Sequence, residues 1–165
     1  MDDATCHEQI DEIVRAHCDT LLLFARQWSA DAAEDVVQES FLRLMKLMKT
    51  TGSPDDVRCW LFRVVRNELT ARHHRRWRRR RREEQVATAR EAWFEPANDA
   101  RLDAAEAARQ LAGLPLDQRE TVVLRIWGGL AFEDIANLTN TSRSTAHRRY
   151  IAAIDTLRKR LALEE

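Results

Sequence analysis

The chain has 165 residues, of which 33% are charged and 44% hydrophobic, and its 27 basic residues balance 27 acidic residues. This composition suits a helix-rich protein of one domain or two small ones, and four glycines with three prolines leave little room for a turn-dense β architecture. No apolar run approaches the ~20 residues of a membrane span, and the acidic N-terminus does not suit a signal peptide, so we expect no membrane insertion and a cytoplasmic location.

Apolar residues that recur at steps of three and four predict three helices in the first half of the chain. The first spans 10–28. The second begins with Asp31 as its N-cap and ends near Lys49. The third has Ser53 as its cap and Pro54 at its first helical position, and it continues into an arginine-rich segment.

Positive charge is concentrated in residues 70–82, which hold eight arginines and no acidic residue. The flanking segments are acidic, because 1–69 carry 8 basic and 13 acidic residues and 83–106 carry 2 and 7. Such a block could be a solvated tail, an address for an acidic partner or a phosphate-binding surface. Consecutive residues cannot share one helix face, so only part of the block could touch a single ligand.

Helical periodicity fades at 83–99, which we interpret as an acidic linker. Trp93 and Phe94 within it are large to leave exposed, so we expect them to dock against a neighbouring domain. Beyond the linker, the pattern predicts a short helix at 102–111 and another at 115–127.

Residues 132–161 have the pattern of a helix-turn-helix. Ala136 lets two helices approach closely, Asn140 tolerates the left-handed bend, and Ala146 packs the second helix on the first. Ser142 is the expected N-cap of that second helix. A plain helical hairpin is the alternative. By elimination, four residues point outward where a recognition helix meets DNA, namely Arg143, Ser144, His147 and Arg148.

The sequence offers little support for catalysis or for a cofactor. Cys6, Cys18 and Cys59 lack CxxC spacing, and although His7 and His17 lie nearby, no ligand pair has the spacing of a metal site. No P-loop, GxSxG or HExxH motif occurs. We therefore expect no enzymatic activity, no small-molecule substrate, no metal and no cofactor.

Three segments together resemble the signature regions of extracytoplasmic-function sigma factors, in order and in spacing. They read AAEDVVQESFLRLMK, VRCWLFRVVRNELTARHHRR and LAGLPLDQRETVVLRIWGGLAFEDIANLTNTSRSTAHRRYIAAIDTLRKRL. The resemblance implies an all-α fold of two small helical domains. A three- or four-helix bundle at 1–82 would bind core RNA polymerase and the minus-10 promoter element. After a linker at 83–102, a helix-turn-helix domain at 103–165 would bind the minus-35 element of promoter DNA.

The resemblance also implies contact residues. A stripe of the second helix would dock on core polymerase, with a solvated face as the alternative, and it consists of Asp35, Gln38, Glu39 and Leu42. A loop and the third helix would hold an extruded base, single strand and phosphates of the minus-10 element through Thr51, Ser53, Asp56, Arg63, Arg66, Asn67, Arg72, Arg75 and Arg76. The minus-35 contacts would be Ser142, Arg143, Ser144, His147 and Arg148.

Three positions depart from the family pattern, where the chain has Ala71, Ala131 and Asn140. An anti-sigma factor is a further partner that the resemblance implies. Two other functions compatible with the sequence are a helix-turn-helix transcriptional regulator that acts without core polymerase, and a general nucleic-acid binder that uses the arginine block.

Overall fold

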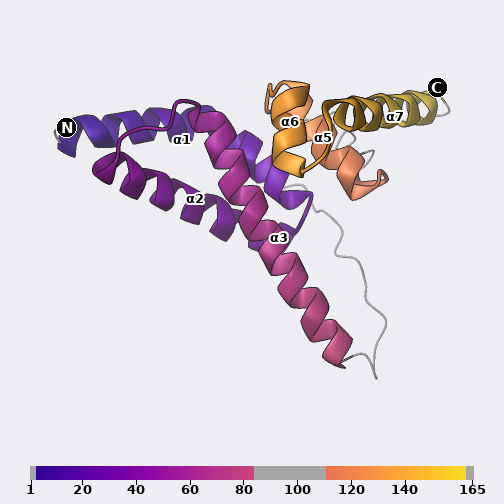
Figure 1. Cartoon of the computed structure of the whole chain (residues 1–165), viewed down its shortest axis with the longest axis horizontal. Helices are drawn as coiled ribbons and strands as arrows, with labels where there is room; N and C mark the ends of the chain where they lie inside the picture. Colours follow the sequence, from indigo (N-terminus) through magenta and orange to yellow (C-terminus); the bar gives the residue numbers. More distant parts are fainter. Residues whose placement is uncertain (1–2, 84–110, 163–165) are drawn as a thin grey trace. The chain divides into compact units, whose positions relative to one another are not determined.

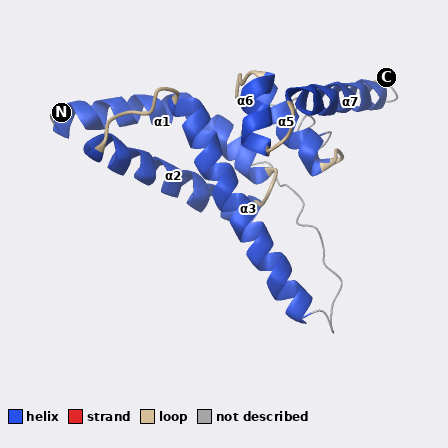
Figure 2. Ribbon diagram, viewed as in Figure 1, coloured by secondary structure: helices blue, strands red, loops and turns tan. Residues whose placement is uncertain are grey.

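The computed structural model describes residues 3–83 and 111–162. Within these ranges it contains six α-helices and no strand (Figures 1 and 2). The chain divides into two compact units, Met1–Ala92 and Trp93–Glu165. The predicted all-α class is thereby confirmed for the described residues. No helix in this part of the chain is long and apolar enough to cross a membrane.

Several predictions concern residues that lie outside the described ranges. The expected linker does so from Glu84 onward, together with Trp93 and Phe94. The expected helix at 102–111 is described only at its last residue, Leu111.

The first unit is a bundle of α1 (Asp3–Arg26), α2 (Ala30–Thr50) and α3 (Val57–Glu83). Each of the three helices packs against the other two. Its core is apolar, and the rings of Phe24 and Phe62 meet edge to face with their centroids 5.4 Å apart. Figure 1 shows the last turns of α3 continuing beyond α1 and α2, and the side chains of 73–79 are exposed there.

The starts of all three helices differ from the sequence prediction. α1 begins at Asp3 rather than at residue 10, and α2 begins at Ala30, with Ser29 instead of Asp31 at the N-cap position. The prediction that Ser53 and Pro54 start α3 is also wrong. Gly52, with a φ of 99°, turns the chain after α2, and the loop then continues to Asp56.

Asp56 caps α3, because its Oδ1 accepts a hydrogen bond of 2.8 Å from the Cys59 amide. A carboxylate is a good N-cap, since it accepts from an otherwise unpaired amide and also faces the positive end of the helix dipole. The cap therefore falls three residues later than predicted.

The second unit contains α5 (Leu116–Ile126), α6 (Phe132–Thr139) and α7 (Arg143–Leu161), all of which pack against one another. Val122, Val123, Leu130, Ile135 and Ala153 are among its buried residues. Two polar contacts add to this packing. Arg149 of α7 forms an ion pair of 3.0 Å with Asp117 of α5, and Arg160 donates a 2.9 Å hydrogen bond to the Gly113 carbonyl.

The predicted helix-turn-helix is confirmed in detail. Asn140 ends α6 in the left-handed conformation, with φ 53° and ψ 47°. Ala136 and Ala146 are buried, as a close approach of α6 and α7 requires. The Ser142 hydroxyl caps α7 by accepting a 3.1 Å hydrogen bond from the amide of Thr145.

Candidate nucleic-acid and protein interfaces

The predicted contact stripe of α2 lies on its solvent side. The buried face of the helix includes Ala33, Val37, Phe41 and Leu44, which leaves the neighbouring stripe free to face outward. All four predicted residues line one open depression of about 400 Å³, and those residues are Asp35, Gln38, Glu39 and Leu42. Leu42 is 50% exposed, and charged side chains line the same depression.

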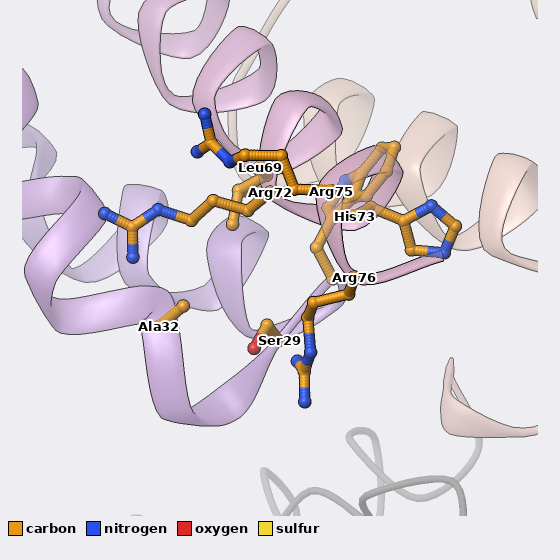
Figure 3. A pocket seen from close by; sticks show the side chains of 8 residues that line it. Ser29, Ala32, Leu69, Arg72, His73, Arg75 and Arg76 are labelled. Atoms are coloured by element: carbon orange, nitrogen blue, oxygen red, sulfur yellow. The ribbon is translucent and has the colours of Figure 1, made fainter. Parts of the chain in front are cut away.

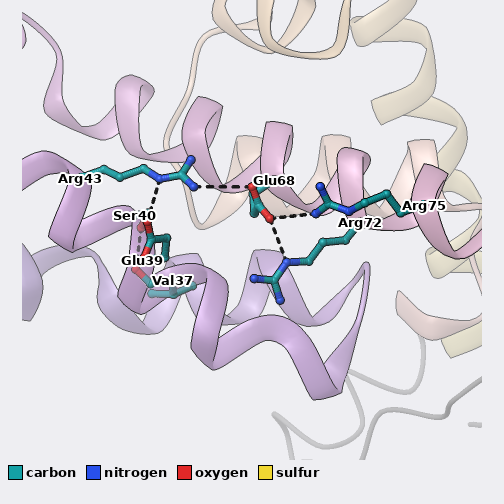
Figure 4. A network of polar contacts seen from close by, with 7 residues as sticks. All are labelled: Val37, Glu39, Ser40, Arg43, Glu68, Arg72 and Arg75. Atoms are coloured by element: carbon teal, nitrogen blue, oxygen red, sulfur yellow. Dashed lines mark hydrogen bonds and ion pairs between the residues drawn. The ribbon is translucent and has the colours of Figure 1, made fainter.

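Three further residues, Arg43, Glu68 and Arg72, complete the lining of this depression. Glu68 and Arg72 belong to α3, so the surface is formed by two helices. Glu68 Oε1 accepts hydrogen bonds from Arg72 Nε at 3.0 Å and from Arg75 at 3.2 Å (Figure 4). Arg43 lies 3.7 Å from the second oxygen of Glu68 and donates a 3.1 Å hydrogen bond to Glu39. We call Glu39, Arg43, Glu68, Arg72 and Arg75 the Glu68 network.

The Glu68 network controls the charge state of its central carboxyl. The hydrogen bond from Arg72 lowers the pKa of Glu68, and the positive charges of Arg72, Arg75 and Arg43 lower it further, against the opposing effect of burial. Glu68 is therefore an ionised carboxylate that holds three guanidinium groups around it.

The loop between α2 and α3 exposes the residues predicted to surround a base. Thr51, Ser53 and Asp56 are all exposed. Their polar groups also serve the loop itself, because the Thr51 hydroxyl donates to the Leu47 carbonyl at 3.2 Å and Asp56 caps α3. A base in this loop would thus meet side chains that the local backbone already orients.

Arg63, Arg66 and Asn67 lie on one face of α3, since they are three and four residues apart. Arg63 and Asn67 are exposed, and Arg66 is half-buried with its guanidinium carbon 5.8 Å from the ring centroid of Trp28. These three of the nine residues predicted to contact the minus-10 element are therefore neighbours on the surface.

A second depression, of about 380 Å³, lies where the turn between α1 and α2 and the start of α2 meet α3 (Figure 3). Its lining consists of Trp28, Ser29, Ala32, Leu69, Arg72, His73, Arg75 and Arg76. Helical periodicity predicts Trp28 as a core residue and gives no indication of this role. The ring of Trp28 meets that of His73 edge-on, and its buried Nε1 has no hydrogen-bond partner in the described parts of the chain.

In the second unit, the residues predicted to read the minus-35 element are exposed around the first two turns of α7. Ser142 is partly committed to structure, because its hydroxyl caps the helix. Arg148 lies 3.3 Å from the hydroxyl of Thr145. Arg143, Ser144 and His147 are exposed beside it, and the Ser144 hydroxyl lies 2.9 Å from that of Ser142.

Comparison with known proteins agrees with this geometry. Residues 13–82 match Sigma-70 region 2, and residues 104–157 match Sigma-70 region 4. The chain belongs to the sigma-70 family. The first match covers most of the α1–α3 bundle, and the second covers the helix-turn-helix, so this sigma factor has both family regions in order.

Sequence relatives support the resemblance to the extracytoplasmic-function group of sigma factors. The chain is 31% identical over 121 residues to the ECF RNA polymerase sigma factor EcfG of Rhodopseudomonas palustris, which covers 73% of this chain and 66% of that protein. It is 24% identical over 145 residues to the RNA polymerase sigma factor SigV of Bacillus subtilis, covering 87% and 84%. The probable RNA polymerase sigma factor RfaY of Xanthomonas campestris is 28% identical, and the chain spans 42% of its length.

Two solved structures share the fold. The sigma factor RpoE in complex with the anti-sigma factor NepR from Bartonella quintana aligns with a TM-score of 0.76 at 24% identity, covering 96% of this chain and 99% of that one. CnrH in complex with the cytosolic domain of CnrY aligns with a TM-score of 0.64 at 23% identity, covering 96% and 91%. The individual contact residues stay predictions.

Proposed function

We propose that this protein binds core RNA polymerase and directs promoter-specific initiation of transcription by recognising minus-10 and minus-35 elements. The observation that carries the proposal is the presence of both sigma-70 regions, in order and each folded as a compact unit. Proposed domain boundaries are 1–82 for the polymerase and minus-10 domain, 83–102 for the linker, and 103–165 for the minus-35 domain.

The first domain would contact two kinds of partner. The exposed Leu42, with Asp35, Gln38 and Glu39 around it, suits a protein interface, because an apolar centre with polar neighbours is typical of such surfaces. Asn67 and Arg63 would contact the minus-10 strand from the solvent side of α3. The loop at 51–56 would receive an extruded base.

The second domain would place the start of α7 in the major groove. Arg143 and Arg148 supply the charge that attracts phosphates and the forked donors that guanine accepts. His147 offers a ring nitrogen to a base edge. Ser142 and Ser144 are small enough to allow a close approach to the backbone.

Further partners and properties follow from this role. One of the two similar structures is a complex with the anti-sigma factor NepR, and the other is a complex with the cytosolic domain of CnrY. An anti-sigma factor is therefore a proposed partner of this chain. The role requires no catalytic group in the sigma factor itself. Its location would be the cytoplasm, because polymerase and promoter DNA are found there.

The test is reconstitution with purified core polymerase on a library of promoters randomised at both elements. We expect co-elution with core and transcripts that start at selected sites. Leu42→Asp should abolish co-elution, whereas Arg143→Ala should keep it and change the selected minus-35 bases. Absence of both co-elution and defined start sites in the unmodified protein would refute the proposal, and sequence-specific DNA binding without polymerase would favour the alternative regulator.

A further inference from the structure

The arginines of α3 do not form one uniform surface. Arg72 and Arg75 both donate to the same oxygen of Glu68, at 3.0 and 3.2 Å, although they lie four and seven residues beyond it. Figure 3 shows their guanidinium groups extending away from that of Arg76. All three arginines line the depression beside Trp28, and they differ in that Arg72 and Arg75 are hydrogen-bonded to Glu68.

The contact stripe of α2 and part of α3, namely Glu68 and Arg72, line the same depression. Arg43 of α2 is held between Glu39 and Glu68, so the Glu68 network connects the two helices across the depression (Figure 4). Glu68 is the sheltered centre, with its side chain 20% exposed, whereas the side chains of Arg72 and Arg75 are 34% and 58% exposed. Arg72 therefore lines this depression with part of its side chain accessible, and Arg75 adjoins it through its hydrogen bond to Glu68.

Pairing changes what these arginines can bind. A guanidinium that already donates to a carboxylate must give up that contact, or share it, before it reaches a phosphate. The negative charge of Glu68 also reduces the local attraction for DNA. By contrast, a protein partner gains from side chains that are already ordered, because less conformational entropy is lost on binding.

We propose that Glu68 is a positioning residue that assigns Arg72 and Arg75 to the polymerase-binding surface, instead of the minus-10 contacts that the family resemblance implies for them, and leaves Arg76 for DNA. This inference rests on the proposed function and extends the interface from the α2 stripe to Arg43, Arg72 and Arg75. The surface combines the exposed carboxylate of Asp35, the Arg43-paired carboxylate of Glu39, an apolar centre at Leu42 and ordered guanidinium groups. It fits a protein surface that presents an aliphatic side chain between basic and acidic side chains, rather than the uniform charge of a phosphate backbone.

The first experiment measures binding to a DNA duplex of arbitrary sequence as a function of salt concentration. Each lost phosphate contact lowers the magnitude of the slope of log K against log salt by about 0.9. We expect Arg76→Ala to lower it by that amount, and Arg72→Ala and Arg75→Ala to leave it unchanged. The same two variants should weaken affinity for core polymerase roughly tenfold, as truncation of an arginine that is an interface hot spot does, while Arg76→Ala should not.

The second experiment removes the carboxylate to which Arg72 and Arg75 donate. Glu68→Gln and Glu68→Ala should steepen the salt dependence by up to about 1.8, since two guanidinium groups become available to phosphates. Adding Arg72→Ala to Glu68→Gln should remove about half of that increase. Glu12→Gln, at an exposed residue of α1, is the control for the loss of one negative charge, and thermal unfolding verifies that each variant is folded.

The outcomes separate this inference from the function on which it rests. If unmodified protein fails to bind core polymerase, the proposed function is wrong. If unmodified protein binds core but Arg72→Ala and Arg75→Ala lower the salt slope as Arg76→Ala does, these residues contact DNA and the inference is overturned. Unchanged affinity of both variants for core would overturn it as well.

Discussion

The ring of Phe132, at the start of α6, meets the imidazole of His147 edge-on across the helix-turn-helix, with the centroids 5.0 Å apart. The guanidinium carbon of Arg125 lies 4.8 Å from the centroid of the same phenyl ring, and Tyr150 also contacts it. His147 is exposed, yet its ring is held by a side chain from the preceding helix. Phe132 therefore links the orientation of a proposed base-reading residue to the packing of the domain.

We predict that Phe132→Ala weakens binding to a selected minus-35 duplex by roughly three- to tenfold, because an aromatic pair is worth about 0.5–1.5 kcal/mol. Phe132→Tyr, which keeps the ring, should bind normally. In a His147→Ala background the effect of Phe132→Ala should disappear, as measured by fluorescence anisotropy in a double-mutant cycle. Fully additive losses would show that the contact does not orient His147.

Asn140 occupies a left-handed conformation that costs most side chains roughly 1–2 kcal/mol. Asn140→Ala should therefore destabilise the second unit by about 1 kcal/mol, and Asn140→Gly should not destabilise it. Urea unfolding followed by NMR signals of α6 and α7 would measure this. Asn137→Ala is the matched control within α6, and it should be neutral or slightly stabilising because alanine favours helix. Equal losses for Asn137→Ala and Asn140→Ala would contradict the argument.

We predict that Asp56, but not its neighbour Asp55, stabilises the first unit by capping α3. Asp56→Ala should lower the stability of the first unit by about 1 kcal/mol, because the Cys59 amide loses its acceptor. Asp55→Ala should change it by less than about 0.5 kcal/mol. Asp56→Asn keeps a good cap without the charge, so it separates capping from any contact with a base. Urea unfolding of the three variants is the measurement.

The Glu68 network should give stability a dependence on pH. Its ion pairs lower the pKa of Glu68 in the folded protein from the ordinary value of 4.5, so below that value the unfolded chain binds the proton first. The contribution of Glu68 is therefore fully present above pH 4.5 and is lost as the pH falls through the lowered pKa. Unfolding midpoints of unmodified protein and Glu68→Gln should differ at pH 7 and converge in acid. A gap that stays constant down to low pH would contradict this account.

The sequence predicted best those features that depend on local pattern. The steps of three and four through Val37, Phe41 and Leu44 define the buried face of α2, and the small residues Ala136 and Ala146 with Asn140 predict the helix-turn-helix. These signals need only one or two adjacent helices. For the same reason the exposed stripe beside Leu42 could be found by elimination.

Features that depend on packing between distant segments could not be predicted in this way. The pairing of Arg43 with Glu68 joins residues of two helices, and no periodicity indicates which carboxylate an arginine block will meet. Trp28 reads as core from its spacing, and only the position of α3 shows that it lines a depression with His73. The start of α3 is a local feature, fixed by the Asp56 cap, that the sequence pattern placed three residues too early.

The far end of α3, where 73–79 are exposed beyond the bundle, has an evolutionary consequence. Apart from His73, which meets Trp28, and Arg75, which pairs with Glu68, we expect substitutions at these exposed positions to change stability by no more than about 0.5 kcal/mol. Arginines at this end can be gained or lost by mutation while the fold persists. The affinity of this end of α3 for a polyanion can therefore evolve separately from the stability of the fold.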